Sequence, residues 1–149
     1  MFITREKNIF NTCVQDFNCG GFALGYLEWI RLYSLHEYDF EEFQYDDTMI
    51  EEATWDSVEE IISMFEENEI RVIYSEKEVT KDEFVVYFRL SDDGDFHFLK
   101  KYHNGRIYHK PGALPICRFN GNPFEDEWSY SINYCGPIVM FAIDNKYYR

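Results

Sequence analysis

Residues 95–112, which read DFHFLKKYHNGRIYHKPG, decide how this sequence can fold. Two strand-like runs flank Asn104-Gly105, and an Asn-Gly pair between such runs is a strong short-range signal for a β-hairpin. We therefore predict one strand over 95–102 and its return strand over 106–110. Each predicted strand carries one histidine, His97 in the first and His109 in the second.

The length of the hairpin loop decides whether these two histidines share a face. A strict two-residue Asn104-Gly105 turn pairs His103 with Arg106, and His97 and His109 then face opposite sides because side chains alternate along a strand. A three-residue loop over 103–105, with Gly105 left-handed, shifts the pairing by one residue. His109 is then diagonal to His97 on the same face, at about 7–8 Å. A joint role for the two histidines requires this three-residue loop.

The flanking sequence predicts two helices before the hairpin and further antiparallel strands around it. Apolar residues fall on nearly every side of the run that starts at Cys19 and continues through residue 35, which is typical of a buried helix. Residues 55–68 form an amphipathic pattern that would cover a sheet. Strands are predicted at 71–74, 84–90 and 137–143. Helices followed by an antiparallel sheet indicate an α+β fold, and the length of 149 residues indicates a single domain, 1–149.

Cys19 is the candidate nucleophile because it opens the predicted buried helix. The N–H groups at a helix start favour the thiolate, and Gly20 and Gly21 leave room for a substrate carbonyl. A thiol hydrolase also needs a base for the thiol proton and a group that orients this base. The hairpin offers His97 as the base and His109 as the orienting residue, so Cys19, His97 and His109 form the predicted catalytic set.

The residues around these positions resemble NlpC-type papain-like cysteine hydrolases. Residues 18–22, NCGGF, are similar to the D-C-S-G-F motif of that family, with Asn18 and Gly20 in place of Asp and Ser. Residues 97–109 resemble its H-x-G-x-Y-x-G-N-G-x-x-x-H hairpin, and 95–112 also resemble a hairpin of small uncharacterised bacterial and phage papain-like proteins. The resemblance implies a papain-like fold, in which a buried N-terminal helix packs on an antiparallel β-sheet. It also implies the same three catalytic roles.

The first functional hypothesis is therefore a cysteine hydrolase. It would act on an amide, peptide or isopeptide bond of a peptide or protein through a thioester on Cys19. Deamidation and acyl transfer use the same groups and are not separated by the sequence. No cofactor or metal is expected, because the cysteines and histidines lack zinc-ligand spacing.

The second hypothesis belongs to a different class and starts from the charge of the chain, which is −14. Such a charge repels nucleic acid and anionic membranes and attracts basic proteins. Residues 36–47, HEYDFEEFQYDD, alternate acids with aromatic residues and would form either a solvated face or, on this hypothesis, a partner-binding surface. The chain could thus be a catalytically silent, acidic interaction protein that blocks a basic groove of its partner, as phage counter-defence inhibitors do.

The chain has four cysteines, Cys13, Cys19, Cys117 and Cys135, and the compartment of the protein decides whether their thiols stay reduced. The polar start of the chain does not resemble a signal peptide, and no apolar run is long enough to span a membrane. We therefore expect a cytoplasmic protein with reduced thiols. Cys13 is a weaker candidate nucleophile than Cys19, because it precedes the helical pattern.

Each candidate residue also has a purely structural interpretation. A single buried cysteine most often serves packing, and a histidine on a strand is most often a hydrogen-bonded core residue. The joint spacing of Cys19, His97 and His109 is what favours chemistry. The lysines of the hairpin are expected to be solvated cross-strand charges: Lys100, Lys101 and Lys110.

Overall fold

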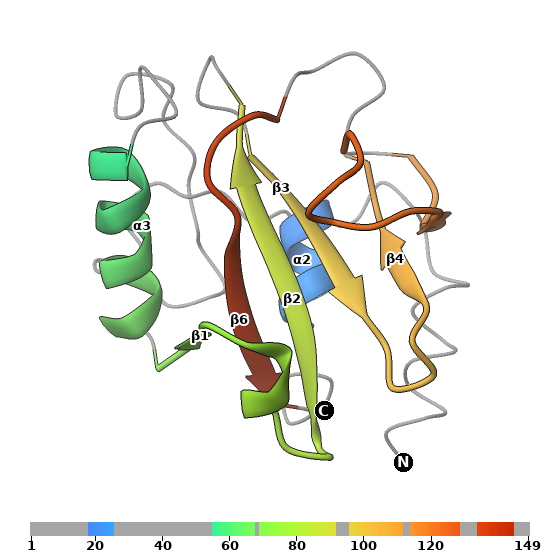
Figure 1. The fold of residues 1–149 in the computed structure, drawn as a ribbon, viewed down its shortest axis with the longest axis horizontal. Helices are drawn as coiled ribbons and strands as arrows, with labels where there is room; N and C mark the ends of the chain where they lie inside the picture. Colours follow the sequence, from blue (N-terminus) through green and yellow to red (C-terminus); the bar gives the residue numbers. More distant parts are fainter. Residues whose placement is uncertain are drawn as a thin grey trace.

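A computed structural model describes residues 18–25, 55–67, 69–91, 96–111, 114–128 and 134–144. Six strands form one antiparallel sheet in the order β1-β6-β2-β3-β4-β5. Figure 1 shows the central part of this order, β6-β2-β3-β4. The described elements are α2 (Cys19–Leu24), α3 (Trp55–Glu67), β1 (Arg71–Ile73), the 3₁₀ helix η2 (Glu76–Glu78), β2 (Glu83–Leu90), β3 (Phe96–Lys101), β4 (Ile107–His109), β5 (Cys117–Phe119) and β6 (Val139–Asp144).

The predicted papain-like α+β fold is wrong. The described residues form mainly the six-stranded antiparallel sheet, with two short helices of 6 and 13 residues. The helix that was predicted to run from Cys19 to residue 35 ends at Leu24. It ends there because Gly25 adopts a left-handed conformation, with φ 87°, and donates its N–H to the carbonyl of Gly21. The predicted helix thus does not continue through Gly25, and its remaining residues, 26–35, lie outside the described part of the chain.

The individual predictions for the helix over 55–68 and for the strands agree with α3, β1, β2, β3, β4 and β6 to within a few residues. The short strand β5 was not predicted. It pairs with β4 through His109 and Cys117, Tyr108 and Arg118, and Ile107 and Phe119. β5 therefore gives the hairpin that carries both histidines a second neighbour.

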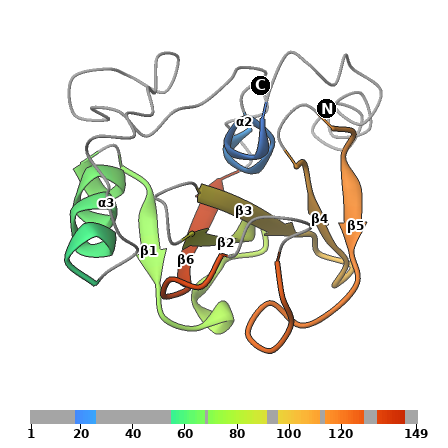
Figure 2. The same cartoon turned by 90° about the horizontal axis from the view of Figure 1, so that it is seen from above.

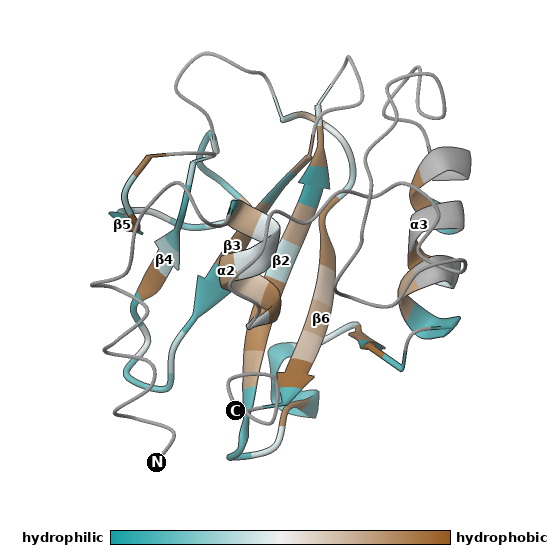
Figure 3. Ribbon diagram, turned by 180° about the vertical axis from the view of Figure 1, so that it is seen from behind, coloured by the Kyte–Doolittle hydropathy of each residue, from teal (hydrophilic) through white to brown (hydrophobic). Residues whose placement is uncertain are grey.

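The sheet has an apolar cluster on each face, because the side chains of β2 alternate. Val86, Phe88 and Leu90 pack with α2 and α3, whereas Val85 and Tyr87 belong to a second cluster that contains Trp128. Figure 2 shows α2 over one face and the chain between β5 and β6 at the other. Figure 3 shows apolar residues running through β2 and β6, which is what burial between two layers requires.

The hairpin between β3 and β4 has the three-residue loop that a joint role of the histidines requires. Lys101 pairs with Ile107, and the N–H of Tyr102 donates to the carbonyl of Arg106 at 2.9 Å. Gly105 closes the loop with φ +85°, in the left-handed region. The observed register is therefore the one that a joint role of the two histidines requires.

We expect the Gly105→Ala variant to lower the free energy of unfolding by about 1 kcal/mol. A Cβ at this position would meet no atom within 4 Å, so the cost comes from the left-handed backbone alone. Urea unfolding of purified protein measures the change. Gly105→Asn is the matched control, with a smaller expected loss because asparagine tolerates this conformation. Equal stability of all three proteins would contradict the assignment of backbone strain to Gly105.

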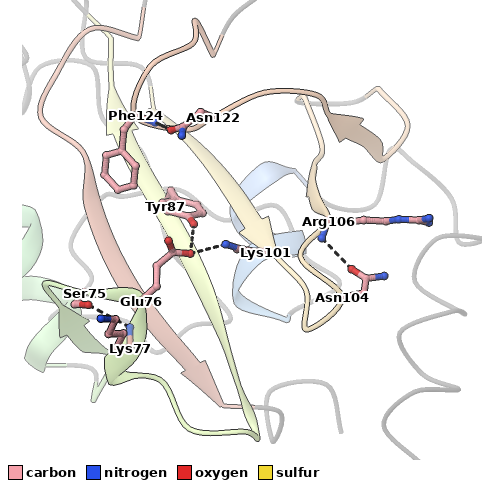
Figure 4. A network of polar contacts seen from close by, with 9 residues as sticks. All are labelled: Ser75, Glu76, Lys77, Tyr87, Lys101, Asn104, Arg106, Asn122 and Phe124. Atoms are coloured by element: carbon pink, nitrogen blue, oxygen red, sulfur yellow. Dashed lines mark hydrogen bonds and ion pairs between the residues drawn. The ribbon is translucent and has the colours of Figure 1, made fainter.

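η2 lies against the face of the sheet opposite α2, where the Glu76 side chain reaches Tyr87 and Lys101 (Figure 4). The Glu76 carboxylate accepts hydrogen bonds from the Tyr87 hydroxyl at 2.6 Å and from Lys101 Nζ at 2.9 Å. Burial raises the pKa of Glu76, but the two hydrogen bonds outweigh burial, so that the net change lowers its pKa. Burial and the bond to Glu76 both raise the pKa of Tyr87. These contacts hold η2 on the face that also carries His97.

Candidate active site

The two predicted histidines are in direct contact. Nε2 of His97, on β3, lies 2.8 Å from Nδ1 of His109, on β4. Both side chains are buried, with 4% and 3% of their surface exposed. The pairing of β3 with β4 runs through Lys101 and Lys100, and Figure 1 shows the strands diverging beyond it. The contact between the imidazoles therefore bridges the strands where they separate.

Aromatic side chains from distant parts of the sequence enclose this pair. The ring of Tyr134 stacks on His97 with centroids 5.3 Å apart, and the ring of Trp128 meets His97 edge-on at 6.5 Å. Phe119, on β5, meets His109 at 5.8 Å. None of these three residues was predicted as part of the site, since no motif or spacing connects them with the hairpin.

Burial sets the protonation state of the pair. Burial and the charge of His109 lower the pKa of His97 from 6.5 to about 3, and burial lowers the pKa of His109 to about 4. Both imidazoles are therefore neutral at pH 7, and one N–H joins them. If Nε2 of His97 donates this hydrogen bond, Nδ1 of His97 is the nitrogen that can accept a proton.

Cys19 opens α2, as predicted. The side chain of Asn18 caps the helix by accepting a hydrogen bond from the N–H of Gly21 at 3.0 Å. The Cys19 side chain is 5% exposed, and its Sγ donates to the carbonyl of Phe96 at 3.9 Å. The thiol thus lies against the peptide bond that joins Phe96 to His97.

The three predicted residues lie in one region, but the two histidines contact each other through side chains and Cys19 is hydrogen-bonded to the main chain of β3. His97 and His109 touch through their rings, whereas Cys19 reaches β3 at the main chain, on the side of the apolar cluster that contains Phe96 and Phe98. The contacts of the His97 ring in the described part of the chain are with His109, Trp128 and Tyr134. Chemistry between Cys19 and His97 therefore requires a change in the position of the thiol.

The helix that carries Cys19 is fixed to β3 by a buried lysine. The ammonium of Lys100 lies 4.3 Å from the ring centre of Phe84, 5.4 Å from that of Phe22 and 5.5 Å from that of Tyr102. Phe22 belongs to α2, so these cation–π contacts join the helix to the sheet. The prediction of solvated lysines is wrong for Lys100 and Lys110, which are fully buried. Lys101 is partly exposed and pairs with Glu76.

Other features that the sequence singled out lie outside the described residues, namely Cys13 and the acidic segment 36–47. Within the described ranges, no group of three or more His, Cys, Asp or Glu side chains could hold a metal ion. The described helices include none that is long and apolar enough to cross a membrane.

Comparison of the chain with family models, with curated proteins and with solved structures found no match.

Proposed function

We propose that this protein is a cysteine hydrolase that acts on an amide, peptide or isopeptide bond through a thioester at Cys19. The observation that carries the proposal is the 2.8 Å contact between Nε2 of His97 and Nδ1 of His109. This contact occurs in the register that a joint role of the two histidines requires. In the proposed tautomer Nε2 of His97 donates this hydrogen bond, so that Nδ1 of His97 takes the proton from the thiol.

The proposed roles follow from the atoms. The Cys19 thiol gives its proton to Nδ1 of His97 as the sulfur attacks the substrate carbonyl carbon. His97 then returns the proton to the leaving nitrogen, and the thioester remains on Cys19. Water, activated by the same imidazole, releases the acid and restores the thiol. His109 holds His97 in the required tautomer and orientation.

The first step requires the thiol to move. In the structure the Cys19 Sγ donates to the carbonyl of Phe96, which is bonded to the nitrogen of His97. Because the pKa of His97 is lowered by burial, the resting state combines a thiol bonded to the Phe96 carbonyl with a neutral imidazole, and not a thiolate with an imidazolium. Rotation of the thiol away from Phe96 is therefore coupled to proton transfer during the attack.

The proposal is tested by the rate at which iodoacetamide alkylates each cysteine of the native protein. Cys135 is exposed and Cys117 is partly buried, so both serve as internal controls. We expect Cys19 to react at least about tenfold faster than Cys135, although it is buried, because proton transfer to His97 accompanies its attack on the reagent as it would on a substrate. Peptide mapping by mass spectrometry at successive times measures all three rates. If Cys19 is alkylated no faster than the whole protein unfolds, the thiol reacts only in the unfolded chain, and the proposal is wrong.

A catalytically silent interaction protein is the second candidate, and the burial of Cys19 favours it. The side chain of Cys19 packs in an apolar cluster with Ala23, Leu24 and Phe96, which a purely structural cysteine would also do. In this alternative, the protein, with its net charge of −14, would bind the basic groove of a partner protein. Slow alkylation of Cys19, together with salt-sensitive binding to a basic protein, would support it.

A reducing compartment fits the proposed chemistry. No disulfide joins the cysteines that the structure describes, Cys19, Cys117 and Cys135. A thiol nucleophile must stay reduced to react. The proposal therefore places the activity in the cytoplasm.

A further inference from the structure

Arg89 lies beside the histidine pair on the same face of the sheet. It is the residue of β2 that pairs directly with His97 of β3. Its Nε donates to the carbonyl of Gly136 at 2.5 Å, and its guanidinium carbon lies 5.8 Å from the ring centre of Trp128. The Trp128 ring in turn contacts His97. The guanidinium is therefore held in one place next to the imidazole.

The charge of Arg89 is not balanced by a carboxylate in the described part of the chain. The ion pairs there join Arg71 to Glu83 and Lys101 to Glu76, and neither includes Arg89. This is unexpected in a chain with 28 acidic and 14 basic residues. The bond to Gly136 uses one of the five N–H donors of the guanidinium. The four donors on the Nη atoms have no acceptor among the described residues.

The guanidinium fork selects the kind of anion that it would bind. Its two parallel N–H groups match the two oxygens of a planar carboxylate. One guanidinium balances a single negative charge, and the strong negative charge of the whole chain disfavours anions that carry more than one. A carboxylate therefore fits this position better than a phosphate.

We propose that Arg89 binds a carboxylate of the substrate, so that the bond cleaved next to His97 lies beside an acidic group. This inference rests on the proposed function, because it places the carboxylate at the site of Cys19 chemistry. Arg89 becomes a specificity-determining residue, and the segment that contains Gly136 and Tyr134 becomes the wall against which it is held.

The test compares alkylation of Cys19 by anionic iodoacetate with alkylation by neutral iodoacetamide at low ionic strength. In the Arg89→Gln variant we expect the iodoacetate-to-iodoacetamide rate ratio to fall at least about tenfold, since a hydrogen bond to a charged group is lost. Arg118→Gln is the matched control, because Arg118 is exposed on β5 and its loss changes the net charge equally. Its ratio should change by less than about twofold. Arg89→Lys should keep part of the preference.

The outcomes separate this inference from the proposed function. An unchanged ratio in Arg89→Gln, with rapid alkylation of Cys19 by iodoacetamide, would overturn the carboxylate site and leave the hydrolase standing. Failure of both reagents to modify Cys19 would remove the hydrolase, and the site is then judged by acetate titration of the native protein, followed at the Nε–H signal of Arg89 by NMR. A saturable shift at Arg89 but not at Arg118 supports the site, and its absence overturns it.

Discussion

Replacement of His97 by glutamine is expected to slow the acylation of Cys19 by p-nitrophenyl acetate by about 10²- to 10⁴-fold. Glutamine has a similar size and stays polar, but it cannot take the thiol proton. The burst of p-nitrophenolate absorbance that accompanies thioester formation measures the rate. Thermal unfolding of each variant checks that the site is still folded.

His109 provides the more discriminating comparison, because in the proposed mechanism it acts only through His97. We expect His109→Gln to cost less than His97→Gln, about tenfold, and the double variant to be no slower than His97→Gln alone. His103→Gln is the control. His103 is exposed at the hairpin loop and contacts the carbonyl of Glu83, so its loss should leave the rate unchanged. Additive losses at His97 and His109 would mean that the imidazoles do not work as a unit.

The free energy of unfolding is expected to fall by several kcal/mol between pH 7 and pH 4 because of the same histidines. Their pKa values in the folded protein, about 3 for His97 and about 4 for His109, lie below the value of 6.5 in an unfolded chain. The unfolded state therefore binds more protons between pH 6.5 and pH 4. The contribution of the two histidines to the free energy of unfolding is fully present above pH 6.5. It is lost as the pH falls, by up to about 1.4 kcal/mol per histidine and pH unit.

Urea unfolding at a series of pH values measures this effect. The double variant His97→Gln, His109→Gln should lose most of the slope below pH 6.5, whereas His103→Gln should keep it. Protonation of carboxylates also relieves the repulsion within a chain of charge −14. The difference between the double variant and the native chain is therefore the quantity to compare, and identical slopes would rule out burial of two neutral histidines.

The hairpin was the most predictable part of the fold, because its information is local. The Asn104-Gly105 pair locates the turn, whereas the choice between a two-residue and a three-residue loop, and hence the register, comes from the structure, in which Gly105 is left-handed. The fold class was not predictable in the same way. The apolar run after Cys19 indicated a long helix, but the left-handed Gly25 ends it at Leu24, and a helical pattern does not reveal how its glycines are used.

The same distinction between local and long-range information applies to the candidate site. His97 and His109 were predictable because twelve residues of one hairpin fix their separation. Arg89, Trp128 and Tyr134 were not, since they reach His97 from another strand and from the chain between β5 and β6. Lys100 was expected in solvent, yet it lies among three aromatic rings, which only the tertiary packing brings together.

The residues of the candidate site differ in how much of the chain must fold before they come into contact. The histidine pair closes over 12 residues, whereas the contact between Cys19 and Phe96 closes over 77. The longer closure costs about 1.6 kcal/mol more chain entropy, and contacts of such separation form after local ones. The imidazoles can thus assemble within the hairpin alone, while the thiol takes its place only when α2 docks. During synthesis, Cys19 emerges first and becomes part of the candidate site last.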